Sequence, residues 1–315
     1  MTSQRTTAAG EYPTSFRRHG AGHSYKIDGV KVLGATTIIS AGTPSKGLNK
    51  WMCDTVAGCA IDEWDALAAM PPSERMKYLA KAPDRARDEA GIRGTKVHKL
   101  AEPLSHGDQV EVPEPLTGYV EACVGFLDDW HAHPLFTETH VFSRKWMYGG
   151  SPDALFDVDR PDGAPPSVVP GLGEDRWRVL IDWKTKKSGP FGTDAYQLAA
   201  YRWAEFRLEL GEGHFDGCPL CEGNGDQPHT AHEIPWAWAP SGDPGGNDLT
   251  GALPLADECW IVWLRSDSYQ VVPMETNRRV HKQFLYIKMV AEAMDDCRDY
   301  RMAALTPPRR AAVTA

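Results

Sequence analysis

The sequence predicts an α/β fold with a mixed sheet, and three observations support that prediction. From about residue 89 onward, segments with helical periodicity alternate with short β-branched runs, in the order helix, three strands, helix, strand pair, helix. Apolar residues make up 42% of the 315 residues, which is enough for a large core. Two Gly/Pro-rich stretches, 160–176 and 211–256, interrupt this order and are interpreted as insertions.

Residues 1–87 are predicted to form an N-terminal hairpin and helical region. β-branched residues broken by glycines predict a short hairpin within 25–40. Apolar residues at helical spacing predict a helix over 48–70, which two consecutive prolines end. One or two further helices are expected in 73–107, and the last of them is expected to end before Pro103.

Residues 88–315 are predicted to form the core domain, in which no internal repeat is present. The elements expected from residue spacing and turn residues are a helix over 116–133, strands over 139–144, 153–159 and 178–185, a helix over 193–210, a strand pair over 258–275 that turns near 266–268, and a C-terminal helix over 277–304. The C-terminal helix is expected to be amphipathic.

Composition and charge narrow the class of function. A formal net charge of −9 argues against a strongly basic protein that coats nucleic acid non-specifically. A nuclease with a local basic groove remains compatible with this net charge. No run of 18 apolar residues is present and the N-terminal residues lack the apolar core of a signal peptide, so a cytoplasmic protein without membrane contact is expected. Seven cysteines, an odd number, favour thiols or metal ligands over a disulfide framework.

The segment VLIDWKTKK at 179–187 places charges at the end of an apolar run. Because side chains alternate along a strand, Asp182 and Lys184 are expected to project side by side from one face. A surface salt bridge is the simplest explanation of such a pair. The alternative is a carboxylate that holds a divalent cation, beside an ammonium that orients a water molecule or meets developing phosphate charge.

Two motifs upstream are candidates for the same site. Gly149 and Gly150 predict a turn, after which Asp153 opens a strand, either as a metal ligand or as a turn cap. Gly94 is expected to open a helix with His98 one turn in. The imidazole there either faces the same pocket as the two aspartates or belongs to ordinary packing.

A fourth motif follows on the next helix, where Gln197 and Tyr201 are four residues apart and share a face. Two interpretations remain open. Gln197 with Asp194 resembles a capping box that closes the helix start, and Tyr201 then belongs to the core. Alternatively, both side chains lie beside the acid–lysine pair and contact a nucleic-acid backbone.

Together the motifs resemble, in their order, the motif series of the PD-(D/E)XK nuclease superfamily and of its RecB-like exonuclease branch in particular: Gly94-x-x-x-His98, Gly150-x-x-Asp153, Asp182-x-Lys184 and Gln197-x-x-x-Tyr201. Phage-type and CRISPR-adaptation nucleases belong to this branch. The resemblance covers roughly residues 89–264, and it rests on the order of four motifs that are weak one by one. It implies a restriction-endonuclease-like αβββαβ core with a central mixed sheet.

The resemblance implies a Mg²⁺- or Mn²⁺-dependent deoxyribonuclease, expected to be an exonuclease, in phage or bacterial DNA recombination, replication or repair. The metal ligands that it implies are His98, Asp153, Asp182 and the backbone carbonyl of Trp183. The residues that would act on the substrate are Lys184, which would position the attacking water and stabilise the pentavalent phosphate, and Gln197 and Tyr201, which would support the site or the DNA strand. Glu138 precedes the first core strand, where some members carry an acid.

Two alternatives to the nuclease stay open: a catalytically silent protein of the same fold that binds DNA ends, and a zinc-organised interaction protein. The joint presence of Asp153, Asp182 and Lys184 favours the active enzyme, because a decayed site usually loses one of them. DNA is the expected partner, with a recombination or replication protein as a candidate second partner. Iron–sulfur members of the branch carry three closely spaced C-terminal cysteines, and the absence of that spacing here argues against such a cluster.

The insertion at 211–256 contains a second candidate metal site. Its ligands would be two thiolates and two imidazoles from one short segment, Cys218-x2-Cys221 and His229-x2-His232. Soft sulfur and nitrogen ligands in two close pairs suit tetrahedral Zn²⁺, and a site with four protein ligands would be closed and structural. The alternative is a glycine-rich insertion with incidental cysteines and histidines.

We predict that the purified protein contains about one zinc ion per chain and that the Cys218→Ser/Cys221→Ser variant contains none. Elemental analysis after dialysis against a weak chelator measures both. Cys53→Ser, the same chemical change outside the motif, is expected to retain the metal. Equal zinc content in the double variant and the wild type would contradict the assignment.

Overall fold

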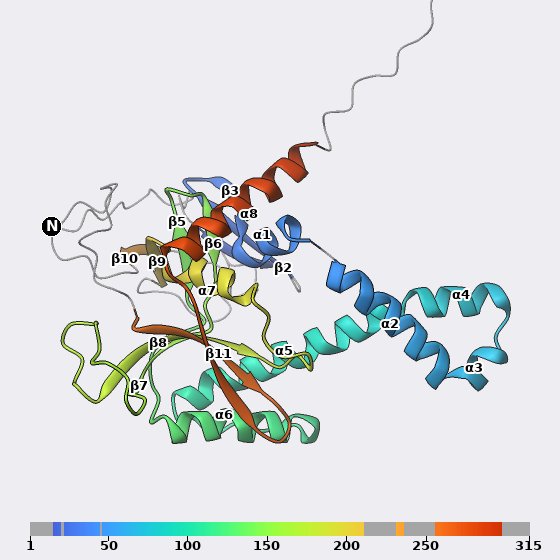
Figure 1. The fold of residues 1–315 in the computed structure, drawn as a ribbon, viewed down its shortest axis with the longest axis horizontal. Helices are drawn as coiled ribbons and strands as arrows, with labels where there is room; N and C mark the ends of the chain where they lie inside the picture. The colour runs from blue at the N-terminus through green and yellow to red at the C-terminus, as the bar shows by residue number, and fades with distance from the viewer. Residues whose placement is uncertain (1–14, 20–21, 45, 211–230, 236–255, 298–315) are drawn as a thin grey trace, which may run out of the picture.

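The computed structural model describes residues 15–19, 22–44, 46–210, 231–235 and 256–297. The strands in these ranges (Figure 1) are β1 (Ser15–His19), β2 (Gly22–Ile27), β3 (Val30–Gly34), β4 (His133–Thr137), β5 (His140–Ser143), β6 (Tyr148–Gly150), β7 (Ala154–Asp159), β8 (Arg176–Lys184), β9 (Phe206–Leu210), β10 (Ala231–Pro235), β11 (Glu258–Leu264) and β12 (Tyr269–Met274).

The helices in the same ranges are α1 (Ala35–Gly42), α2 (Lys46–Asp62), α3 (Trp64–Ala68), α4 (Pro72–Ala80), α5 (Ala82–Ser105), a 3-10 helix (Glu114–Leu116), α6 (Thr117–Asp129), α7 (Asp194–Arg202) and α8 (Arg278–Asp296). None of the helices in this part of the chain combines the length and the apolar character needed to cross a membrane.

Two mixed sheets form the body of the molecule, which confirms the predicted α/β class but replaces the single sheet that was expected. One has five strands in the order β12-β11-β8-β7-β4, all antiparallel except for the β11–β8 pair. The other has seven strands in the order β1-β2-β3-β6-β5-β9-β10, with β3 and β6 parallel. The strand predicted over 139–144 corresponds to β5 and lies in the seven-stranded sheet, whereas β4, which was not predicted, joins the five-stranded one.

β8 supplies apolar side chains to both faces of the five-stranded sheet. Val179 and Ile181 pack in the core that α5 and α6 cover, whereas Leu180 packs on the opposite side with α1, α7 and α8. All three side chains are completely buried. Because side chains alternate along a strand, the same pattern puts Asp182 and Lys184 on the face that α7 covers, as predicted.

Two predicted elements change type part of the way along. The hairpin predicted over 25–40 exists as β2 and β3, but from Ala35 onward the chain forms α1. The helix predicted over 193–210 ends at Arg202, and β9 follows. The sequence FRLEL of β9 alternates apolar and polar residues, which is a strand pattern. The segment forms a strand because β5 is available as its hydrogen-bonding partner.

α5 runs through two residues that were expected to bound helices. Gly94, expected at a helix start, lies in the middle of α5, where a Cβ would be 3.6 Å from Thr185 Oγ1 in the segment after β8. Pro103 lies in the last turn, and the helix continues to Ser105. Only one backbone hydrogen bond is lost so close to a helix end. The burial of Ala101 and Ser105 against the body holds this turn in place.

The glycine pair predicted to form a turn lies instead in β6, within the seven-stranded sheet. A Cβ at Gly149 would overlap the ring of Tyr25, and a Cβ at Gly150 would overlap the ring of Tyr201. The two positions therefore require glycine because two tyrosine rings approach the backbone closely, and not because of turn geometry.

Helices α2, α3 and α4 extend with the first turns of α5 as an arm away from the two sheets (Figure 1). The arm is held together by its own contacts. Tyr78 Oη donates a hydrogen bond to Glu63 Oε2 at 2.6 Å, and the guanidinium of Arg85 lies 3.9 Å from the centre of the Tyr78 ring. α5 then continues without a break from the arm into the body, across the domain boundary expected at residue 87.

α8 begins where the C-terminal helix was predicted to begin. The side chain of Asn277 caps it by accepting a hydrogen bond from Val280 N at 3.1 Å. The part of that prediction beyond residue 297 lies outside the described residues. α8 packs along α1 and α7, so the apolar face that the sequence predicts for it is the face that closes the core.

His281 is a buried histidine of α8 that takes part in this core. It stacks on Trp203, and its Nε2 lies 3.2 Å from Tyr148 Oη. Tyr148 donates its only hydroxyl hydrogen to the Ala200 carbonyl at 2.8 Å, so the tyrosine oxygen accepts the hydrogen of His281 Nε2. Burial lowers the pKa of His281 to about 4.

We predict that His281 makes the protein less stable in mild acid. Its pKa is lower in the folded than in the unfolded state, so its contribution is complete above the unfolded value and is lost as the pH falls toward 4. Between pH 7 and pH 5 the free energy of unfolding of the wild type should fall by about 2 kcal/mol more than that of His281→Phe. Urea unfolding in EDTA measures both, and equal pH dependence would contradict the prediction.

Candidate metal centre

The candidate site lies where the chain passes from one sheet to the other. Glu138 stands between β4 and β5, which belong to different sheets, and residues 151–153 connect β6 to β7 in the same way. The two connections are joined by a hydrogen bond of 2.8 Å from Glu138 N to the carbonyl oxygen of Asp153. Acidic residues from two separate parts of the chain therefore meet at this junction.

Three side chains that can bind a metal ion gather there: His98 from α5, Glu138 and Asp153. One ligand atom from each lies within 4.8 Å of the others, and no other group of this kind occurs in the described ranges. Asp153 is only 9% exposed, whereas His98 and Glu138 are half-buried. The group is therefore recessed but open to solvent on one side.

His98 connects α5 to the two strands that carry the predicted aspartates. Its Nε2 lies 3.1 Å from the carbonyl oxygen of Trp183, and because a carbonyl only accepts, Nε2 is the donor. Its Nδ1 lies 3.2 Å from Asp153 Oδ1. Asp153 Oδ2 in turn accepts a hydrogen bond of 2.7 Å from Trp183 N. The Trp183 carbonyl, predicted as a metal ligand, is thus hydrogen-bonded to a second predicted ligand.

Asp182 and Lys184 lie beside this group. Asp182 is 2% exposed, and its Oδ2 forms an ion pair with Nζ of the half-buried Lys184, so this pair is more enclosed than the surface salt bridge considered as an alternative. Gln197 Nε2 donates to Asp182 Oδ1 at 2.7 Å and to Tyr201 Oη at 3.0 Å. Lys184 Nζ donates to Gln197 Oε1 at 3.3 Å. The capping-box interpretation is wrong, because Thr193 is the N-cap of α7 and no side chain caps this helix.

The charges of this cluster are strongly coupled. Burial disfavours the charged form of His98, but the carboxylates of Asp153, Asp182 and Glu138 together outweigh burial and raise the pKa of His98 to about 9. Burial alone would raise the pKa of Asp153, yet His98 reverses the effect and holds it below its usual value. Burial raises the pKa of Asp182 to about 6, against the attraction of Lys184. Two buried acids therefore depend on two cationic side chains for their charge.

Glu138 is held in an uncommon backbone conformation. Its φ angle is +47°, in the left-handed region that costs a non-glycine residue about 1 kcal/mol or more. The hydrogen bond from its own N to Asp153 helps to keep it there. Strain of this kind at a residue that joins a ligand cluster is typical of a functional position. The carboxyl of Glu138 was the least defined of the predicted acids, and the structure brings it into the same cluster as His98 and Asp153.

The donor set suits a hard divalent cation. Carboxylate oxygens with one imidazole are ligands for Mg²⁺ or Mn²⁺, whereas a zinc or iron–sulfur site is typically richer in thiolates. Asp182 Oδ2 has its ion pair with Lys184 but accepts no hydrogen bond of normal geometry from the described residues, so it is a further oxygen next to the group. A cation that takes a nitrogen of His98 as a ligand has to displace a proton from it.

The lysines that follow the acid–lysine pair divide into two kinds. Lys186 Nζ donates to Asp194 Oδ2 at 2.7 Å and lies 4.3 Å from the ring centre of Phe191, so it fixes the connection between β8 and α7. Asp194 also accepts a hydrogen bond from Phe191 N at 2.7 Å. Lys187 is exposed. Of the two, Lys187 is therefore the one whose charge is presented to solvent.

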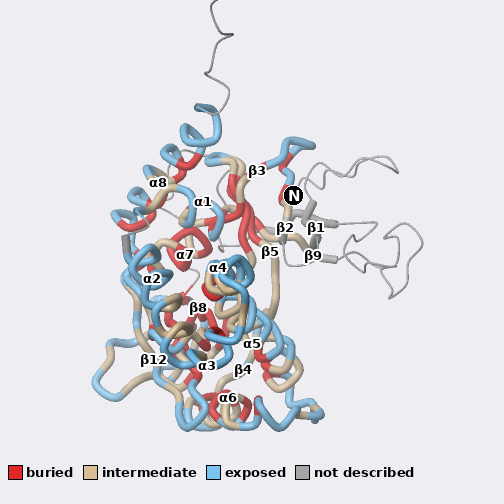
Figure 2. The backbone as a smooth tube through the Cα atoms, turned by 90° about the vertical axis from the view of Figure 1, so that its right-hand side faces the viewer, coloured by how far each residue is buried: buried red, intermediate tan, exposed pale blue. Residues whose placement is uncertain are grey.

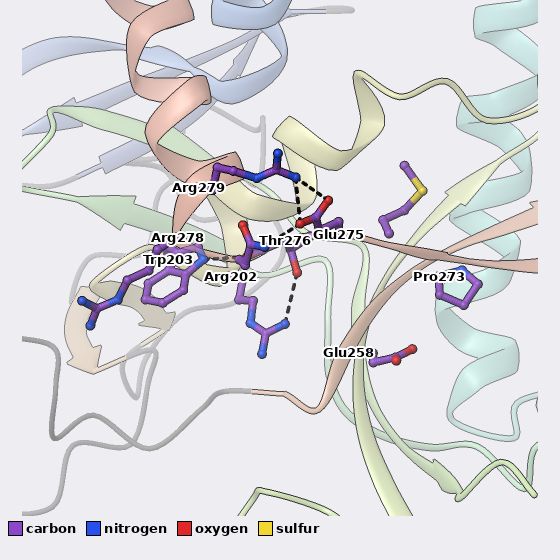
Figure 3. Close-up of a pocket in the computed structure, with 10 residues that line it drawn as sticks. Arg202, Trp203, Glu258, Pro273, Glu275, Thr276, Arg278 and Arg279 are labelled. Atoms are coloured by element: carbon purple, nitrogen blue, oxygen red, sulfur yellow. Dashed lines mark hydrogen bonds and ion pairs between the residues drawn. The ribbon is translucent and has the colours of Figure 1, made fainter. Parts of the chain in front are cut away.

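A pocket of about 670 Å³ lies elsewhere, at the end of α7 and the start of α8 (Figure 3). None of the residues in the metal cluster lines it. Its charged groups are largely paired within the protein: Arg279 Nη2 contacts the Glu275 carboxylate at 2.8 Å, and Arg202 Nη2 donates to the Ala256 carbonyl at 2.8 Å. The pocket is therefore separate from the candidate metal site at the junction of the sheets.

The zinc prediction concerns residues that are for the most part outside the described ranges. Cys218, Cys221 and His229 lie outside them, and His232 belongs to β10, where its backbone pairs with Glu209 of β9. Zinc binding stays a prediction. Of the cysteines in the described ranges, none belongs to a group of three potential metal ligands.

We predict that Glu138 contributes to binding of Mn²⁺. Glu138→Gln keeps the size of the side chain but removes its charge, so the affinity for Mn²⁺ should fall by at least about tenfold. Isothermal titration calorimetry on protein freed of metal measures this. Glu121→Gln, the same change at an exposed position of α6, is the matched control and should bind like the wild type. Equal affinity in both variants would exclude Glu138 as a ligand.

Comparisons with known proteins assign no family to this geometry. The chain matches no protein-family model and no curated protein. What is established about the site is therefore the arrangement of its own residues: a histidine and two acids at the junction of two sheets, next to a buried aspartate that is paired with a half-buried lysine.

Proposed function

We propose that this chain is a Mg²⁺- or Mn²⁺-dependent deoxyribonuclease. It would act as an exonuclease, hydrolysing phosphodiester bonds progressively from the ends of DNA. The observation that carries the proposal is the convergence of His98, Glu138 and Asp153 within 4.8 Å, with the Asp182–Lys184 pair on the adjacent strand. Phosphodiester hydrolysis needs a nucleophilic water and compensation of the charge that develops on the phosphate. A cluster of acids for a cation, next to a lysine, provides for both.

The strand order of the five-stranded sheet supports the proposal. β4, β7 and β8 are antiparallel neighbours in this sheet, with β5 and β6 of the other sheet between β4 and β7 in the chain. α7 follows β8, and β11 is parallel to β8. With α5 and α6 before them, and with β5, β6, β9 and β10 set aside in the other sheet, the elements of this sheet run helices, three strands, helix, strand. This order is compatible with a restriction-endonuclease-like core in which the acid–lysine strand, here β8, would be the third strand.

Each residue of the cluster would have a separate role. His98, Glu138 and Asp153 would bind the cation, with Asp182 and the Trp183 carbonyl beside them. A bound Mg²⁺ or Mn²⁺ would lower the pKa of a water molecule, and it would place positive charge next to the phosphate oxygens.

Lys184 would orient the attacking water and balance negative charge on the phosphate. Its environment suits both tasks. Burial opposes its charged form, but the neighbouring Asp182 and Asp153 raise the pKa of Lys184 above its usual value, so the ammonium is kept. Gln197 holds Lys184 and Asp182 together through its amide, which fixes the direction of both groups toward the cluster.

The assignment to DNA ends, and to phage or bacterial recombination, replication or repair, rests on the four motifs and their resemblance to RecB-like exonucleases. The arm is compatible with it: α4 and the adjoining part of α5, over residues 72–93, carry six basic side chains interleaved with four acidic ones, in a chain whose net charge is −9. A silent protein of the same fold that only binds DNA ends is the competing function, and the presence of the complete cluster argues against it.

We predict that the protein degrades linear DNA in Mg²⁺ or Mn²⁺ but not in EDTA, and that Lys184→Ala lowers the rate by at least about a hundredfold. Labelled linear single- and double-stranded DNA, beside a covalently closed circle of the same sequence, measures rate and dependence on ends. An exonuclease should spare the circle.

Lys31→Ala is the matched control, since it removes one exposed lysine on β3, outside the cluster. Its rate should equal that of the wild type. Loss of cleavage in both lysine variants would point to general charge effects. Absence of cleavage of any DNA or RNA form with either metal would refute the nuclease, and retained binding to DNA ends in that case would favour the silent protein.

A further inference from the structure

α8 has a second apolar face that is not part of the core. Its inner face buries Val280, Phe284 and Ala291 against the body, as expected for an amphipathic helix. Its outer face exposes four large apolar side chains: Tyr286 (54%), Met289 (65%), Val290 (49%) and Met294 (56%). Exposed residues recur along the whole of α8 in Figure 2. A contiguous exposed patch of this kind on a globular protein commonly marks an interaction site.

The outer face has the spacing of a helix-pairing seam. Lys282, Tyr286, Met289, Ala293 and Asp296 follow one another at intervals of four, three, four and three residues, and all are exposed. This alternation keeps side chains on one line along a helix that packs against another helix. The stretch from Lys282 to Asp296 is uninterrupted helix.

The charges at the two ends of the seam identify the partner that fits it. Lys282 lies at the N-terminal end and Asp296 at the C-terminal end, separated by roughly 21 Å along the helix axis. They cannot meet within one helix. In an antiparallel pair of two such helices related by a twofold axis near Met289, Lys282 of each copy would lie opposite Asp296 of the other.

We propose that α8 is a self-association surface, on which α8 of a second copy of this chain packs antiparallel through the seam defined by Lys282, Tyr286, Met289, Ala293 and Asp296. Met289 then meets the partner's Met289 at the axis, Tyr286 covers it on both sides, and two Lys282–Asp296 pairs close the ends. Such an isologous contact is closed, so it yields a dimer and no longer chain of copies.

The area of the seam sets the strength of the dimer. One patch of this kind covers a few hundred Å², so two of them bury less than the roughly 1,200 Å² at which stable interfaces begin. The dimer should therefore be weak, with a dissociation constant in the micromolar range. The acidic C-terminal end of the seam disfavours a polyanionic occupant such as nucleic acid.

Sedimentation velocity over a concentration series of the full chain tests the proposal. The wild type should shift from monomer to dimer as its concentration rises through the micromolar range. Met289→Glu should stay monomeric, since it puts two like charges at the axis, and its exposed position leaves the fold intact, which circular dichroism checks. Val30→Glu, the same change at an exposed position of β3, is the matched control and should dimerise normally.

A charge swap tests the antiparallel register. Lys282→Glu and Asp296→Lys should each weaken the dimer at least about tenfold by placing like charges opposite one another, and the double variant should restore it. Met289→Cys, with Cys53 and Cys297 replaced by serine, should form an intermolecular disulfide on mild oxidation, whereas Lys31→Cys in the same background should not. A monomer at every concentration, a dimer unaffected by Met289→Glu, or a double variant as weak as the single ones would each overturn the proposal.

Discussion

The rest of the site depends on the burial of two carboxylates, one on β8 and one at the position just before β7. Asp153 and Asp182 are 9% and 2% exposed, and water therefore cannot stabilise their charges. The protein compensates with His98 on one side and Lys184 on the other. The acids raise the pKa of both cationic side chains, whereas burial raises the pKa of Asp182 despite the attraction of Lys184. A divalent cation between the acids would compensate them more completely than a histidinium does, which is the physical reason to regard the cluster as a metal site.

One peptide group ties the compensating residues to the scaffold. The N–H of Trp183 donates to Asp153 and its carbonyl accepts from His98, so a single position of β8 orients two candidate ligands, one just before β7 and one on α5. The indole of the same residue is buried against Phe126 of α6, 5.3 Å between ring centres. Packing on one face of the sheet and polar geometry at its edge are therefore set by the same residue. This explains why an apolar tryptophan stands between an aspartate and a lysine that face the other way.

The local parts of this arrangement could be predicted from the sequence, and the parts that require two distant segments could not. The alternation in β8 suffices to pair Asp182 with Lys184, and helical spacing suffices to pair Gln197 with Tyr201. The position of Glu138 next to His98 and Asp153 could not be predicted in this way. It depends on the left-handed backbone conformation of Glu138 itself, which lies between strands of two different sheets. β9 was predicted as helix for a similar reason: its character is decided by β5, more than sixty residues earlier in the chain.

The two glycines of β6 show how core packing reaches the site. The Tyr201 ring can approach the backbone at Gly150 this closely only because that residue has no Cβ, and the Tyr201 hydroxyl accepts the hydrogen bond from Gln197. Gln197 uses its other hydrogen on Asp182 and its oxygen on Lys184. If the Tyr201 ring moved, the Gln197 amide would therefore move with it, and the positions of both Asp182 and Lys184 would change. The glycine is part of the site although it touches no ligand, because it sets how deeply the tyrosine that anchors this amide can sit.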